Sequence, residues 1–267
     1  MEHQTFTLDF FNKVLTANFL RYFLVALPAF LLFYIFFKKK WKHKRIQFNF
    51  PKFSDYTREI IYSLITVLIF AGVGMVVFAT PVRQHILLYQ DFSQYGWAWW
   101  FSSIILMIVL HDTYFYWTHR AMHHPRLFKV FHLVHHKSTN PSPWASYAFH
   151  PLEGIVEASV IFPIVFLIPF HFTALMAFLM FMMIYNVYGH LGYELYPKKF
   201  NQHPIGRWLN TSVNHNMHHK YFTGNYGLYF LFWDRWMGTI HPNYDVIYQE
   251  VDQKRSRDSN KLNSNYQ

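Results

Sequence analysis

The sequence predicts an all-α fold, in which a polytopic bundle of membrane-spanning helices carries a histidine-rich helical cap on its cytoplasmic side. Long apolar runs alternate with basic connections, and charged residues make up only 14% of the 267 residues, about half the share of a typical soluble domain. Fifteen of the eighteen histidines fall between His111 and His241. Many of them recur three or four residues apart, a spacing that places side chains on one face of a helix.

Composition excludes several classes of protein and site. The chain has no cysteine, which rules out disulfides, thiolate-bound zinc, iron–sulfur clusters and a cysteine nucleophile. The formal charge of +10 does not indicate a nucleic-acid partner, because the basic residues cluster beside apolar runs. That arrangement is typical of loops that face a cytoplasmic leaflet.

The first part of the chain, residues 1–104, is expected to form the N-terminal membrane spans. The first apolar run, Tyr22–Phe37, ends in a dense basic cluster at Lys38–Arg45. The second, Ile60–Ala79, is twenty residues without a charge, close to the length that spans a bilayer. The third begins in a group of tryptophans, typical of an interfacial anchor, and extends from Trp97 directly into the histidine region.

A membrane hairpin is predicted at about residues 154–188. The apolar stretch Ala158–Val187 has His171 as its only side chain that ionises near neutral pH, and Pro163 and Pro169 interrupt it. Because proline removes a backbone donor and clashes with the preceding turn, one straight helix of this length is disfavoured. We therefore expect two helices that turn near Pro169 and His171.

Residues 105–248, which include this hairpin, are expected to form the catalytic region. Residues 249–267 are expected to form a disordered tail, because they have almost no apolar side chains. The basic cluster at Lys38–Arg45 places the end of the first span on the cytoplasmic side. Two further crossings and a returning hairpin then bring the whole of residues 111–136 and 190–219 to that same side.

The histidine spacing predicts a metal site with two ions. One HxxxH run and two HxxHH runs each direct two or three imidazoles to one spot if the runs are helical. The candidate ligands are His119, His123, His132, His135, His136, His190, His215, His218 and His219. Nine imidazoles exceed one tetrahedral site and suit two metals with open positions. Imidazole binds zinc, copper, iron or nickel, so these ligands do not name the metal.

The segments HDTYFYWTHRAMHH, FHLVHH, SYAFHPLEG, GHLGYELYP and NHNMHH resemble the fatty acid hydroxylase and sterol desaturase superfamily, whose members are integral membrane di-iron oxygenases. The resemblance covers roughly Ile105 to His241, and His190 corresponds to the family's additional histidine. It implies two iron ions, activation of dioxygen and a lipid substrate such as a sterol or fatty acyl chain. Some members carry a fused haem domain with an HPGG motif. The chain has no such motif, so a separate electron donor of cytochrome or ferredoxin type is expected.

Metal-bound imidazoles need polar partners that fix their tautomers. The candidates for this role are Asp112, His150, Glu153, Glu194 and Asn214, and His150 remains a possible ligand as well. No residue other than the metal ligands is assigned a catalytic role.

Three functions remain open: a lipid hydroxylase or desaturase of this superfamily, an acyl-type desaturase, and a non-catalytic metal-binding membrane protein. The HxxxH spacing favours the hydroxylase branch. A transporter would place ionisable side chains within its spans, and these spans are nearly free of them.

The lack of a terminal retrieval signal favours a bacterial inner membrane over the endoplasmic reticulum. Purified protein is expected to contain zinc in some preparations, since zinc competes well for these ligands.

Overall fold

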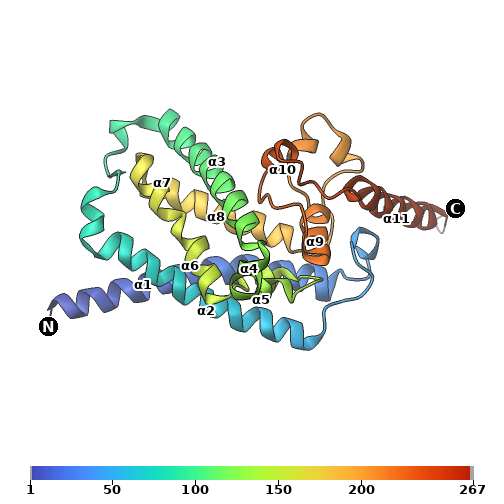
Figure 1. The fold of residues 1–267 in the computed structure, drawn as a ribbon, viewed down its shortest axis with the longest axis horizontal. Helices are drawn as coiled ribbons and strands as arrows, with labels where there is room; N and C mark the ends of the chain where they lie inside the picture. Colours follow the sequence, from blue (N-terminus) through green and yellow to red (C-terminus); the bar gives the residue numbers. More distant parts are fainter. Residues whose placement is uncertain (1, 265–267) are drawn as a thin grey trace.

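The computed structural model describes residues 2–264, with side chains described for residues 8–256. Its architecture is set by four long helices, each long and apolar enough to cross a membrane (Figure 1). They are α1 (Glu2–Phe30, continued by the π-helical Leu31–Phe36), α2 (Phe53–Ala79), α3 (Gly96–Met122) and α8 (Phe172–Gly189). The prediction of an all-α, multi-pass membrane fold is confirmed.

Helices α1 and α2 form a long antiparallel pair. At the end far from the histidines, Val14 of α1 lies so close to Gly74 that a Cβ on the glycine would approach it to 3.0 Å. Near the histidine end, Phe30 packs edge-on against Tyr56 with ring centroids 5.2 Å apart. The first helix therefore begins well before Tyr22, where the apolar run starts in the sequence.

The hairpin consists of α6 (Pro151–Ser159), α7 (Ile161–Leu167), the two-residue strand β2 (Phe170–His171) and α8. The chain turns at Phe170–His171, the position near Pro169 and His171 where the turn is predicted. A second break, at Val160 between α6 and α7, was not predicted. Pro163 lies in the first turn of α7, where a missing backbone donor is tolerated, so the helix breaks before the proline instead of at it.

Strand β1 (Leu88–Tyr89) pairs in parallel with β2 and ties the connection after α2 to the hairpin turn. Short 3₁₀ helices link the other elements, at Lys42–Lys44, Pro81–His85, Phe92–Gln94, Pro143–Tyr147, Phe200–Gln202 and Gly206–Trp208.

The histidine-rich cap is built from short helices that gather at one end of the long ones (Figure 1). These are α4 (Pro125–Phe131), α5 (Leu133–His136), α9 (Ser212–Tyr221) and α10 (Phe232–Trp236). The expected boundary after residue 104 falls inside α3, so the cap is continuous with a membrane helix.

The end of the chain differs from the expected disordered tail, because α11 extends over Tyr244–Ser264. Its first half is anchored by apolar side chains at helical spacing, namely the buried Tyr244, Tyr248 and Val251, which pack in one cluster with Val213 and Met217 of α9. This stripe begins before residue 249, where the polar composition of the tail starts. Residues 265–267 lie outside the described part.

Candidate metal centre

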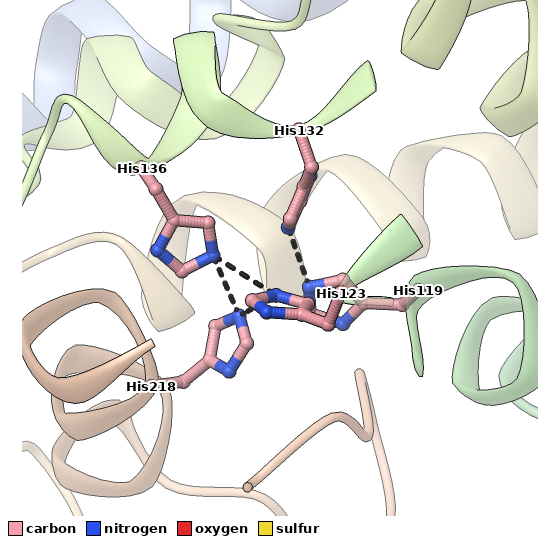
Figure 2. Close-up of side chains that lie close together, drawn as sticks. All are labelled: His119, His123, His132, His136 and His218. Atoms are coloured by element: carbon pink, nitrogen blue, oxygen red, sulfur yellow. Dashed lines mark hydrogen bonds between the residues drawn. The ribbon is translucent and has the colours of Figure 1, made fainter. Parts of the chain in front are cut away.

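All nine candidate imidazoles meet in two adjacent groups. The first group contains His119, His123, His132, His136 and His218, and the second contains His135, His190, His215 and His219. Within each group, one ring nitrogen from each residue lies within 4.8 Å of those of the other residues. Figure 2 shows the five rings of the first group turned toward a common point, from elements far apart in the sequence.

Helices α3, α4, α5 and α9 supply the first group. His119 and His123 stand four residues apart at the end of α3. His132 lies at the junction of α4 and α5, and His136 ends α5. His218 comes from α9, in which every residue from Ser212 to His219 is buried. Most of these histidines therefore lie at the ends of helices and not in their middles.

Each HxxHH run divides its histidines between the two groups, which differs from the expectation that one run points at one spot. In the first run His132 and His136 join the first group, whereas His135 joins the second. In the second run the i and i+4 histidines join the second group and His218 joins the first. At about 100° per residue, positions i and i+4 nearly coincide around a helix, while i+3 lies about 100° away from i+4. Both runs therefore serve both groups.

The protonation pattern of the first group fits a bound cation. His119 Nδ1 donates to the carbonyl of Tyr226 at 2.9 Å, and His132 Nδ1 donates to Glu153 Oε1 at 2.6 Å. A neutral imidazole that donates through Nδ1 carries no proton on Nε2. The Nε2 atoms of these two residues are nevertheless 2.9 Å apart. Two lone pairs at this distance repel one another unless a cation lies between them.

Other Nε2 pairs show the same separation. The distance is 3.0 Å between His136 and His218 and also 3.0 Å between His190 and His215. Two nitrogens about 2.1 Å from one metal and at right angles to each other are about 3.0 Å apart. His190 Nδ1 donates to the carbonyl of Asn186 at 2.8 Å, which again leaves Nε2 free. The residues of both groups therefore fit a metal ion.

Burial keeps these side chains in the form that binds metal. Loss of solvent, and then the neighbouring imidazoles, lower the pKa of His132, His135 and His136 well below the usual range. Burial also lowers the pKa of His190 to about 4. The imidazoles are therefore neutral near pH 7, and neutral imidazole is the metal-binding species.

Of the polar residues expected to fix tautomers, Glu153 contacts a clustered histidine directly, through its hydrogen bond with His132. The carboxylate of Asp112 instead accepts the backbone N–H groups of Tyr229 and Phe230 at 2.7 and 3.2 Å. It thus fixes the chain after α9 to helix α3.

Two of the other three expected residues hold helix ends. Glu194 accepts the N–H of Val213 at 3.0 Å, at the start of α9. The His150 ring accepts the N–H of Leu152 at 3.3 Å and caps α6. Asn214 is fully buried in α9. Glu194 therefore acts on the histidines through the helix that carries three of them.

Sequence reasoning missed the loop that follows α9. Its backbone carbonyls at Gly224 and Tyr226 accept hydrogen bonds from Nδ1 of His218 and of His119. The loop is held by Asp234, whose carboxylate accepts the N–H of Tyr226 at 2.9 Å and that of Gly227 at 2.8 Å. Backbone acceptors carry no side-chain signature, so the sequence gives no signal for them.

Replacing Gly224 by alanine is expected to weaken metal binding by about 10-fold or more, the usual effect of disturbing the partner of a ligand. Gly224 has φ of +73°, and a Cβ there would lie 2.7 Å from the carbonyl oxygen of Thr239. The backbone must shift, and the acceptor for His218 Nδ1 shifts with it. Metal titration of the purified variant measures the effect.

Gly238→Ala is the matched control, because Gly238 has φ of +65° but open space around a Cβ. It should lose about 1–3 kcal/mol of stability from backbone strain and keep its metal affinity. Equal metal affinity in the two variants would contradict a role for the Gly224 carbonyl.

A cavity of about 570 Å³ leads away from the metal centre. Histidines of both groups form part of its wall, including His119, His132, His135, His190 and His215. Most of the remaining wall is made of Phe, Leu, Ile, Val and Met side chains from the long helices and the hairpin. The size is typical of a site for a small organic ligand, and the wall suits an apolar one.

Comparison with known proteins gives one consistent result. A family model described as "Fatty acid hydroxylase" matches residues 104–239. The chain is 32% identical over 243 residues to the Delta(7)-sterol 5(6)-desaturase ERG3B of Gibberella zeae, covering 89% of this chain and 72% of that protein. It is 31% identical to the lathosterol oxidase of Rattus norvegicus, covering 72% of this chain and 64% of the relative. It is also 31% identical to the human lathosterol oxidase, covering 61% and 54%. No solved structure matches.

These relatives overturn one expectation. They come from a fungus and two mammals, and this contradicts the preference for a bacterial inner membrane over the endoplasmic reticulum. The multi-pass membrane character is supported by the four candidate spans.

Proposed function

The chain belongs to the fatty acid hydroxylase family, as an oxidoreductase related to the sterol desaturases, and from this premise we propose that it oxidises a C–H bond of a sterol-class lipid at two iron ions. The observation that carries the proposal is that one apolar cavity, opening among the membrane helices, ends on the histidines of both groups. A lipid in that cavity would present its hydrocarbon to the metal centre.

The two histidine groups would each hold one iron ion, with five nitrogens available in the first and four in the second. Bound iron would supply the activation of dioxygen that oxidation of an unactivated C–H bond requires and that side chains cannot supply. The chain's own residues fix the geometry. Glu153 keeps the proton of His132 on Nδ1 and its Nε2 free, and the apolar wall excludes water from the reacting carbon.

The printed names of the relatives, sterol desaturases and lathosterol oxidase, favour a sterol as the substrate and removal of two hydrogens over hydroxylation. This shifts the balance away from the hydroxylase branch that the HxxxH spacing favoured. Reduction of dioxygen would use electrons from a separate donor protein of cytochrome or ferredoxin type.

The test uses the full-length protein, loaded with iron and reconstituted in lipid nanodiscs with a chemical reductant, a Δ7-sterol and ¹⁸O-labelled dioxygen. We expect mass spectrometry to show a sterol product that has lost two hydrogen atoms and contains no label. Incorporation of the label into the sterol would show hydroxylation instead. Oxidation of the acyl chains of the nanodisc lipids, with the sterol unchanged, would favour an acyl-type desaturase and overturn the proposed substrate class.

A further inference from the structure

The cavity wall contains a buried carboxyl group that the metal centre does not use. Glu157 of α6 is 8% exposed and lines the cavity. No hydrogen bond or ion pair to its side chain is present among residues 8–256. More than nine-tenths of the residue is buried, and the open space that it borders is the cavity.

Several other buried polar side chains along the same wall already have partners within the protein. His111 shares a hydrogen bond of 2.7 Å with the hydroxyl of Tyr229, and Asn186 donates to the carbonyl of Ser146 at 2.8 Å. Glu153 accepts from a clustered histidine. Glu157 differs from these three in having no hydrogen bond to its side chain. The hydroxyl of Tyr147, which also lines the cavity, has no partner among the described residues either.

The position of Glu157 relates it to the metal centre. It follows Glu153 by four residues on α6, so the two side chains share a face of the helix and lie about 6 Å apart along its axis. Glu153 in turn contacts His132. A ligand group bound to Glu157 would therefore lie about one helical turn from the level of the histidines.

A carboxyl group facing an apolar cavity is unfavourable unless it is hydrogen-bonded. The wall residues that follow it in the chain include Val160, Ile161 and Ile164, none of which has a side chain that can donate a hydrogen bond. A purely hydrocarbon ligand would displace water and leave the carboxyl group unpaired. A hydroxyl group can donate to it and also accept from it, so it satisfies the carboxyl group in either protonation state.

We propose that Glu157 hydrogen-bonds a hydroxyl group of the lipid substrate and selects lipids that carry this hydroxyl within a few bonds of the oxidised carbon. The proposal rests on the proposed function for the identity of the oxidised lipid. A sterol has one hydroxyl at the polar end of a rigid hydrocarbon. Its bond to Glu157 would determine which ring carbons face the histidines.

The experiment compares Glu157→Leu, Glu157→Gln and the unchanged protein, all iron-loaded in nanodiscs. Binding of a radiolabelled Δ7-sterol is measured by competition with the unlabelled sterol and with its analogue that lacks the hydroxyl group. The unchanged protein should prefer the hydroxylated sterol by about 10- to 100-fold, the value of a buried hydrogen bond to a carboxyl group. Glu157→Leu should reduce this preference to within about 3-fold, and Glu157→Gln, which keeps an acceptor, should retain most of it.

Glu250→Leu, a change at an exposed carboxylate on α11 outside the cavity wall, should leave the preference unchanged. Metal content and thermal unfolding confirm that each variant is folded. An unchanged preference in Glu157→Leu overturns the proposal, and so does equal binding of both sterols by the unchanged protein. If the unchanged protein binds the hydroxylated sterol preferentially but does not oxidise it, the proposed function fails. The comparison of variants still decides the role of Glu157.

Discussion

Alanine in place of His136 or His219 is expected to remove metal from the group that loses the side chain and to reduce lipid oxidation by at least about 100-fold. Loss of a mere partner of a ligand costs about 10- to 100-fold, and these substitutions remove a ligand nitrogen itself. His136 Nε2 lies 3.0 Å from His218 Nε2, and His219 Nε2 lies 3.1 Å from His190 Nε2. Each variant therefore leaves an incomplete set of nitrogens around one position.

Metal content and sterol oxidation should be measured on the same preparations. His171→Ala is the control, because His171 lies in the hairpin turn and its ring caps α8 by accepting the N–H of Thr173 at 3.3 Å. It should lose no more than the about 0.5–2 kcal/mol of a helix cap and keep its metal. The ligand assignment would be wrong if His136→Ala or His219→Ala kept two metal ions and full activity while His171→Ala lost its metal and its activity.

The second large effect is expected at Glu153. Removing its carboxyl group in Glu153→Ala takes away the acceptor for His132 Nδ1, 2.6 Å away, and leaves a buried donor unpaired. The imidazole can then rotate or change tautomer. Metal affinity and activity should each fall by about 10- to 100-fold.

Glu153→Gln separates this positioning role from a general loss of stability, because the amide oxygen can still accept the Nδ1 proton. It should recover most of the metal affinity that Glu153→Ala loses, and the spectrum of bound cobalt or iron should return toward that of the unchanged protein. If the two variants bind metal equally well, the hydrogen bond to His132 does not orient the ligand.

The spacing of histidines predicted eight of the nine side chains that gather, because helical periodicity determines which residues share a face even when the helices are short. The ninth, His190, was indicated by the family resemblance. The spacing did not predict how they divide. His135 and His136 are neighbours in sequence and belong to different groups, and this depends on where α9 packs against α5. Packing between segments nearly eighty residues apart is a tertiary property that spacing alone does not contain.

The polar surroundings were less predictable than the ligands. Five residues qualified by type as partners, and of these Glu153 contacts a histidine in the described structure. The backbone carbonyls of Gly224 and Tyr226 also accept hydrogen bonds from clustered histidines. These acceptors could not be found from residue types. The helical α11 in place of a disordered tail has a similar cause, since Tyr248 and Val251 are too few to outweigh a polar composition in sequence but suffice to anchor a helix on an existing core.

The division of each HxxHH run between two groups has a mechanical consequence. Helices α5 and α9 each contribute nitrogens to both positions, so two occupied positions join the helices at two points. If only one metal position linked α5 and α9, one helix could still rotate relative to the other. Two linked positions fix their relative orientation. Filling the first position also brings together the side chains of the second. Loading should therefore be cooperative, and a protein with one ion should be a minor species between the empty and the doubly loaded forms.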